Sequence, residues 1–209
     1  MEIETEIKFT IPDKEIFNRV PKCTEIASYT TVDRGVKQHI DTYFDTDGFR
    51  LYHEKVVFRL RTSENRTILV CKTQIPSENG IYRREETEAE TDCTPEEVCS
   101  GNIPDLQPFR ILHDLLGDVR LIQSLCVINN RHTILLCRND EPYFELVLDD
   151  VTFTGHGGTH KVLELEVESI TGTTEDLHHI GKWLSDRFDL KPAGPSKYIL
   201  GMDLVGNVE

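Results

Sequence analysis

Residues 2–8 alternate charged and apolar side chains, and this alternation limits the possible folds more than any other feature of the chain. In this stretch, EIETEIK, every second residue is charged and the residues between them are largely apolar. Side chains of a β-strand point alternately to opposite faces, so the stretch predicts a strand with one charged face. A strand half exposed on a protein surface shows the same alternation. The pattern becomes informative only if other strands repeat it with complementary charge.

Several other segments do repeat it. We expect strands over residues 38–45, 55–62, 67–73, 81–91, 126–137, 143–151 and 161–169. In the last of these, Glu164, Glu166 and Glu168 share one face and the other face is apolar. In the second, Arg59 and Arg61 share one face. Charged strand faces of both signs therefore come from both ends of the chain and from its middle.

Helical patterns separate and follow these strands. A short helix is expected over residues 13–20, and a capping box at residues 94–97 begins a helical insertion that runs to about residue 125. Thr174 is expected to cap a final helix with an apolar stripe. We expect the tail that carries Lys197 to be extended. The whole chain, residues 1–209, is interpreted as one domain with this insertion packed on the sheet.

The charge balance excludes some partners. The chain has 23 basic and 37 acidic side chains, a net charge of -14 and no run of about eighteen apolar residues. Nucleic-acid duplexes and anionic membranes bind basic surfaces, so neither is expected as a partner. The acidic amino terminus has no signal-peptide pattern, and the six cysteines form no CxxC pair, so we expect a cytoplasmic protein with reduced thiols. The oligomeric state is not indicated.

If the strands form one closed antiparallel sheet, its inner face encloses two sets of charges. The basic set consists of Lys8, Arg59, Arg61, Lys72, Arg84, Arg131 and Lys197. The acidic set consists of Glu4, Glu6, Glu86, Glu88, Asp149, Glu164 and Glu166. Burying unpaired charges is unfavourable by several kcal/mol each, so such an interior is better explained by a ligand than by stability.

The chemistry of the two sets indicates which ligand. Arginine and lysine side chains bind multiply charged anions, and guanidinium groups match phosphate oxygens. Clustered carboxylates suit hard divalent cations such as Mg²⁺ or Mn²⁺. Together they predict a metal-dependent site for an oligophosphate. The alternative is a set of solvated strand faces joined by weak salt bridges, which repetition over six or seven strands disfavours.

The charged residues also occur in a familiar order. Residues 4–8 read ExExK, and the further matches are Tyr43-Phe44-Asp45-Thr46, Arg59-Leu60-Arg61, Lys72, Arg84 with Glu86 and Glu88, Leu148-Asp149, Glu164-Leu165-Glu166 and Ser196-Lys197-Tyr198. This ordered set resembles the CYTH, or triphosphate tunnel metalloenzyme, family. The resemblance implies a mainly β, α+β fold: an eight-stranded antiparallel closed barrel, or tunnel, with helices packed outside.

The resemblance also implies residue roles. Carried over by position, the metal ligands are Glu4, Glu6, Glu164, Glu166, Asp149, Glu86 and Glu88. The triphosphate-binding residues are Lys8, Arg59, Arg61, Lys72, Arg84, Arg131 and Lys197. One departure is visible: the family often has a further lysine before Arg131, where this chain has Asn129 and Asn130. We expect the missing charge to loosen the grip on one phosphate or to alter substrate choice.

The expected activity is metal-dependent hydrolysis of a linear triphosphate, with tripolyphosphate as substrate and Mg²⁺ or Mn²⁺ as cofactor. The catalytic residues would be Glu4, Glu166, Lys8 and Lys197, with either glutamate as base. Alternatives are a thiamine triphosphatase, a class IV-type adenylate cyclase converting ATP to cyclic AMP, and a noncatalytic polyphosphate-binding module. Replacing Glu4 or Glu166 with alanine is expected to abolish turnover and to leave the Tm unchanged or raised.

Overall fold

The computed structural model describes residues 2–64, 66–76, 80–194 and 196–206, and this part of the chain forms one ten-stranded antiparallel sheet. Eight strands close into a ring, because the last of them pairs with the first. Around the ring they are β1 (Glu2–Thr10), β6 (Tyr82–Glu90), β5 (Arg66–Ile75), β4 (Val57–Ser63), β3 (Tyr29–Asp45), β7 (Ile122–Arg138), β8 (Glu141–Gly155) and β9 (Gly158–Ser169). The predicted eight-stranded barrel is confirmed.

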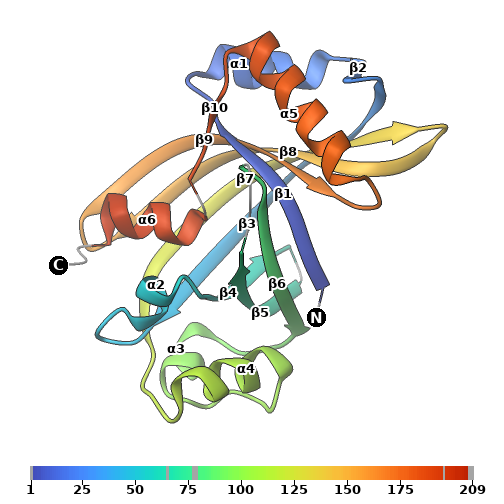
Figure 1. Cartoon of the computed structure of the whole chain (residues 1–209). Helices are drawn as coiled ribbons and strands as arrows, with labels where there is room; N and C mark the ends of the chain where they lie inside the picture. The colour runs from blue at the N-terminus through green and yellow to red at the C-terminus, as the bar shows by residue number, and fades with distance from the viewer. Residues whose placement is uncertain (1, 65, 77–79, 195, 207–209) are drawn as a thin grey trace.

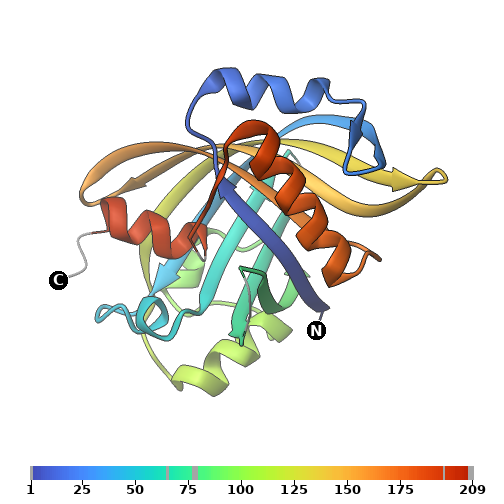
Figure 2. The same ribbon diagram turned by 45° about the horizontal axis from the view of Figure 1, so that its top comes forward.

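Helices cover the apolar outer face of this barrel on two sides (Figures 1 and 2). On one side, α1 (Lys14–Arg19) and α5 (Thr174–Phe188) pack on apolar residues of β1, β8 and β9. On the other, α3 (Pro95–Cys99) and α4 (Gln107–Leu116) pack on β4 and β5. Because the strands turn many of their apolar side chains outward, these two clusters form a core between the sheet and the helices, and charged residues occupy the middle of the barrel.

A further helix, α6 (Lys197–Val205), packs inside one end of the barrel. The side chains of Tyr198 and Met202, on this helix, join an apolar cluster with inward-facing Val57, Val127 and Phe153. The approach is close: a Cβ atom on Gly201 would lie only 2.5 Å from the Leu125 side chain and 2.7 Å from that of Phe153. The interior is therefore apolar and filled at the α6 end.

The short elements join these layers. The two-residue strands β2 (Glu25–Ile26) and β10 (Lys191–Pro192) pair with β3 and β1, respectively, and a 3₁₀ turn over Val20–Lys22 follows α1.

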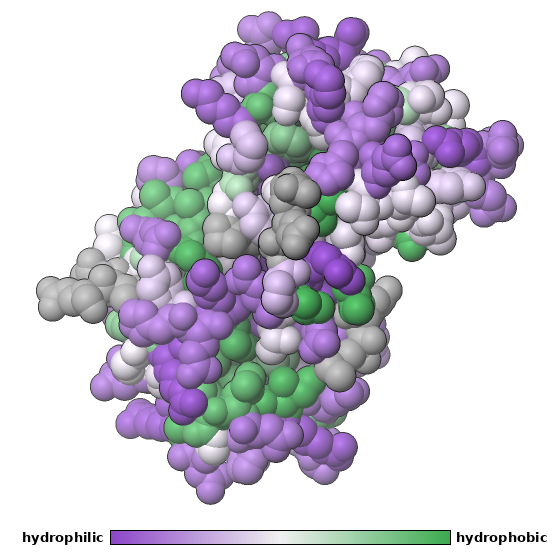
Figure 3. Space-filling view, in the orientation of Figure 1, coloured by the Kyte–Doolittle hydropathy of each residue, from purple (hydrophilic) through white to green (hydrophobic). Residues whose placement is uncertain are grey.

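None of the helices in the described residues is long and apolar enough to cross a membrane. In the face shown in Figure 3, apolar residues gather over α3 and α4, and hydrophilic residues dominate around α1 and α5.

The structure corrects several predicted elements. The prediction of an extended tail is wrong. The tail forms the helix α6, and the hydroxyl group of its N-cap Ser196 accepts a hydrogen bond from the Ile199 amide. This helix is largely apolar, so no amphipathic pattern revealed it. Thr173, and not Thr174, caps α5. The helical insertion ends before residue 125, because β7 begins at Ile122. The five-residue helix α2 (Arg50–Glu54) was not predicted.

Candidate functional site

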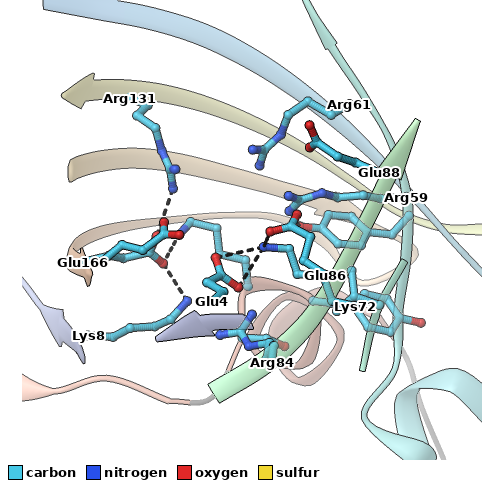
Figure 4. A pocket seen from close by; sticks show the side chains of 16 residues that line it. Glu4, Lys8, Arg59, Arg61, Lys72, Arg84, Glu86, Glu88, Arg131 and Glu166 are labelled. Atoms are coloured by element: carbon cyan, nitrogen blue, oxygen red, sulfur yellow. Dashed lines mark hydrogen bonds and ion pairs between the residues drawn. The ribbon is translucent and has the colours of Figure 1, made fainter. Parts of the chain in front are cut away.

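The middle of the barrel contains a cavity of about 170 Å³ that is surrounded by charged side chains (Figure 4). All seven predicted triphosphate-binding residues line it: Lys8, Arg59, Arg61, Lys72, Arg84, Arg131 and Lys197. They come from β1, β4, β5, β6, β7 and the first turn of α6. Segments that are distant in sequence thus place seven cationic groups around one space.

The predicted metal ligands divide into two groups. Four carboxylates line the cavity: Glu4, Glu86, Glu88 and Glu166. Three others lie in the barrel wall, outside the described lining, with exposed fractions of 2%, 3% and 0%: Glu6, Glu164 and Asp149. The carboxylates of the first group reach the cavity, whereas those of the second group are buried beside neighbouring cations.

Glu166 is the centre of the largest group of ion pairs. Its carboxylate accepts hydrogen bonds from Lys8 Nζ at 2.7 Å, Lys197 Nζ at 2.6 Å and Arg131 Nη2 at 2.9 Å. Lys197 Nζ also lies 2.8 Å from Asp149 and 3.0 Å from Glu164. Burial by itself would raise the pKa of Glu166, but Lys197, Lys8 and Arg131 hold it well below the usual range. The carboxylate is therefore ionised.

A second group of ion pairs lies on β1, β5 and β6. Lys72 Nζ donates to both carboxylate oxygens of Glu4 at 2.9 Å and lies 3.0 Å from Glu86. Arg84 pairs with Glu6, and Lys8 Nζ lies 3.1 Å from the same carboxylate. Burial would raise the pKa of Glu4, but Lys72, Arg84 and Lys8 lower it to about 2. For Glu6 the effect of burial prevails and its pKa is raised.

Glu168 is a cavity residue that was absent from the predicted site. It lines the cavity beside Glu4 and Glu166, yet it makes no hydrogen bond or ion pair with the described residues. Burial, with Glu4 and Glu6 nearby, raises the pKa of Glu168 to about 8. The alternation of β9 contained the necessary signal, because Glu168 shares the inward face with Glu164 and Glu166.

Asp41 is a second missed residue. It is completely buried on β3, and both of its oxygens accept hydrogen bonds from Arg61, at 2.7 and 2.9 Å. Burial opposes ionisation, but Arg59 and Arg61 hold the pKa of Asp41 well below its usual value. Alternation places Asp41 on the face of Tyr43, but it does not show that this face points inward.

Asn129 is one of the two asparagines that stand before Arg131, and it is completely buried. Both of its side-chain amide atoms and Nδ1 of His39, its partner across β3 and β7, lack a hydrogen-bond partner among the described residues. Buried polar atoms of this kind are normally satisfied by internal water. Burial, then Arg61 and Arg131, lower the pKa of His39 to about 4, so this imidazole adds no charge at neutral pH. The effect of Asn129 on phosphate binding stays a prediction.

The donor chemistry of the cavity fits Mg²⁺ or Mn²⁺, because its acidic residues all offer carboxylate oxygens. The pKa values of Glu6 and Glu168 are raised by burial and by neighbouring carboxylates. A divalent cation bound nearby would offset the repulsion between these carboxylates. In the described residues, no three acidic, histidine or cysteine side chains are grouped closely enough to hold a metal ion. The ammonium group of Lys197 instead lies between the carboxylates of Asp149, Glu164 and Glu166.

Solved structures share this architecture. A candidate adenylyl cyclase from Hippeastrum, described as having a dominant triphosphatase activity, is 18% identical with a TM-score of 0.70, covering 96% of this chain and 95% of that one. A candidate adenylate cyclase from Bacillus halodurans is 19% identical with a TM-score of 0.69, covering 96% and 98%. Protein PH1012 from Pyrococcus horikoshii is 19% identical with a TM-score of 0.56, covering 97% and 99%. At sequence identities of 18–19%, the structural similarity shows that this chain has the same fold as these proteins.

The sequence itself matches a family model. No curated protein matches the chain significantly. The CYTH domain model, however, matches residues 2–195, which is nearly the whole chain. The ring of strands and the ordered charged residues agree with that match, and the chain belongs to the CYTH domain family.

Proposed function

We propose that this protein is a metal-dependent hydrolase of linear triphosphates and that inorganic tripolyphosphate is its substrate. The observation that supports this most strongly is the convergence of seven basic side chains, together with carboxylates, on one cavity inside the barrel. A linear polyanion is the ligand that such a ring of cations suits. The triphosphatase activity described for the Hippeastrum protein, which has the same fold, supports this reaction class.

The lining favours an unsubstituted phosphate chain over ATP or thiamine triphosphate. Recognition of a base or a thiamine ring normally uses an exposed aromatic face. Among the described lining residues, the aromatic ones are Tyr43 and Tyr198, and their rings stack on each other with centroids 5.2 Å apart. Both side chains are also only 1% exposed, so neither ring offers an open face to a ligand. The remaining lining is mostly charged and suits phosphate oxygens.

Binding would proceed by an exchange of partners. The phosphate chain would take over contacts that Lys8, Lys197 and Arg131 now make with Glu166. Bound Mg²⁺ or Mn²⁺, held by Glu4, Glu166 and the other carboxylates of the lining, would neutralise charge on the phosphate oxygens. The basic side chains would keep the chain in one orientation and stabilise the charge that develops in the transition state.

The chemical step would be attack of water on a terminal phosphorus atom. The new P–O bond forms as the bridging P–O bond breaks, and pyrophosphate leaves with the bonding electron pair. The proton of the water passes to a carboxylate, for which Glu166 or Glu4 is placed. Both have low pKa values and are weak bases, but a loose phosphoryl-transfer transition state requires little deprotonation of the nucleophile. Lys8 and Lys197 would stabilise the leaving oxygens.

A substrate series tests this proposal. Purified protein with Mg²⁺, with Mn²⁺ or with EDTA is offered tripolyphosphate, ATP, thiamine triphosphate and pyrophosphate, and both phosphate and cyclic AMP are followed. We expect metal-dependent phosphate release with the highest kcat/KM for tripolyphosphate. Glu166→Gln should lower kcat by at least about a hundredfold, whereas Glu141→Gln, at an exposed position on β8, should behave as wild type.

The other outcomes are equally informative. Cyclic AMP formation from ATP would replace the hydrolase by an adenylate cyclase that uses the same cavity. Preference for thiamine triphosphate would reject tripolyphosphate as the substrate. If tripolyphosphate binds but no triphosphate is turned over with either metal, the protein is a binding module and the enzyme proposal is rejected.

A further inference from the structure

Two buried aspartates hold cavity arginines in the same way on different parts of the barrel wall. Asp41 on β3 lies directly across from Arg61 on β4, and Asp149 on β8 lies directly across from Arg131 on β7. Each aspartate has an exposed fraction of 0%. Both arginines line the cavity, whereas neither aspartate belongs to the described lining.

Each pair is bidentate. Arg61 donates from Nε to Asp41 Oδ1 at 2.7 Å and from Nη2 to Oδ2 at 2.9 Å. Arg131 donates from Nε to Asp149 Oδ1 at 2.8 Å and from Nη2 to Oδ2 at 2.7 Å. Two parallel hydrogen bonds fix the plane of a guanidinium group as well as its position. In both arginines Nη1 makes no hydrogen bond to the described residues, and it is left to bind a ligand.

Each aspartate also contacts a second cavity cation. Asp41 Oδ2 lies 3.5 Å from Arg59 Nη1, and Asp149 Oδ2 lies 2.8 Å from Lys197 Nζ. All the oxygens of these two carboxylates are therefore engaged by guanidinium or ammonium groups. A carboxylate in this state would have to give up buried cation contacts before it could coordinate a metal ion, which is unfavourable.

The length of the side chains supports the same division of roles. An aspartate has one methylene fewer than a glutamate, so its carboxylate stays near the barrel wall, where the partner across the strand pair lies. Glu4 and Glu166 are longer and reach the cavity. Glu6 and Glu164 are equally long but lie in the wall, so the role of the two aspartates is assigned from their arginine contacts and not from length alone.

The geometry points to Asp41 and Asp149 as a matched pair of positioning residues that orient Arg61 and Arg131 for the phosphate chain, and not as metal ligands. This inference rests on the proposed triphosphate-binding function, and it changes the role that the family resemblance gave to Asp149. An arginine already held in its binding orientation loses less conformational freedom when the anion binds. Without its aspartate, each arginine could turn away from the ligand and pair with another carboxylate.

Separate measurements of anion and metal binding test the inference. Asp41→Asn and Asp149→Asn are compared with wild type by calorimetry with tripolyphosphate in EDTA, and by Mn²⁺ titration without tripolyphosphate. We expect tripolyphosphate affinity to fall by about tenfold in each variant, with Mn²⁺ affinity unchanged. If the protein turns over tripolyphosphate, KM should rise more than kcat falls. The matched control is Asp150→Asn, next to Asp149 on the same strand, where the carboxylate pairs with Lys14 on the outer surface.

Defined results would overturn the inference. Loss of Mn²⁺ binding in Asp149→Asn with unchanged tripolyphosphate binding would make Asp149 a metal ligand. Wild-type tripolyphosphate affinity in folded Asp41→Asn would exclude a positioning role for Asp41. If an Asn variant does not fold, Arg61→Lys and Arg131→Lys replace it in the test, because they keep the positive charge and lose the bidentate pair with the aspartate. Wild-type tripolyphosphate affinity in these lysine variants would also overturn the inference. Absence of turnover with retained binding would reject only the proposed hydrolase activity.

Discussion

Glu166 is the residue on which three of the cavity cations converge. The sequence alone predicts that its replacement with alanine leaves the Tm unchanged or raised, because carboxylates inside a barrel are expected to be unfavourable. The ion pairs reverse this expectation. In Glu166→Ala, Lys8, Lys197 and Arg131 would each lose a contact of 2.9 Å or less in a buried site.

We therefore predict that Glu166→Ala lowers the free energy of unfolding by roughly 3 kcal/mol, since removing one partner leaves buried charges uncompensated. Urea unfolding of the metal-free protein measures this change. The matched control is Glu88→Ala, because Glu88 lines the same cavity but is exposed and makes no ion pair with the described residues. Equal stability of the two variants would show that the ion pairs of Glu166 are not stabilising.

At the scale of elements, the attachment of α6 places Lys197 in the cavity. Tyr198, the next residue, donates from its hydroxyl group to Asp45 Oδ2 at 2.6 Å. The same carboxylate accepts the amides of Leu51 at 2.8 Å and Tyr52 at 2.9 Å. One buried aspartate at the end of β3 thus connects α2 with α6, and it anchors the helix that carries Lys197.

Tyr198→Phe should remove this anchor with little change in shape. We predict a loss of about 2 kcal/mol in the free energy of unfolding, because a buried hydrogen bond to a carboxyl group is lost. Tyr52→Phe is the control: its hydroxyl group donates to Asp203 at an exposed position between the same two helices, so its loss should be smaller. Urea unfolding compares the two. A larger loss in Tyr52→Phe would place the main attachment of α6 at the surface.

The sequence predicted the strands and helices that have a clear periodicity, and it missed α2 and α6, which have none. Charged alternation in β1, β4 and β6 was sufficient to place four of the seven basic residues on the inward face. The other three cavity cations, Lys72, Arg131 and Lys197, come from β5, β7 and α6. The helix α6 was missed because it is apolar on several faces, packed against the barrel interior on one side and against α2 on another. Asp41 was missed because the polarity of β3 is similar on both faces near residues 38–41, so its inward face becomes clear only from pairing with β4 and β7.

At the scale of the whole molecule, the usual layering of a small domain is reversed. The apolar clusters lie outside the barrel, between sheet and helices, and at the α6 end, while the middle of the barrel is charged. Without a ligand, the basic and acidic groups of this interior satisfy one another, as Lys72 does with Glu4 and Glu86. A polyanion that takes the cations leaves the carboxylates without partners. A divalent cation can then compensate the carboxylates.

This exchange of partners predicts that tripolyphosphate and a divalent metal ion stabilise the protein cooperatively. A ligand that binds only the folded state at a hundred times its Kd adds about 2.7 kcal/mol, which corresponds to roughly 5–10 °C in Tm for a chain of this size. We expect the Tm increase with Mg²⁺ and tripolyphosphate together to exceed the sum of the separate increases, measured by calorimetry at equal free tripolyphosphate concentration. Sodium sulfate at the same ionic strength is the control for screening. Additive shifts would mean that anion and metal bind independently, and that the carboxylates keep their cationic partners when the phosphate chain is bound.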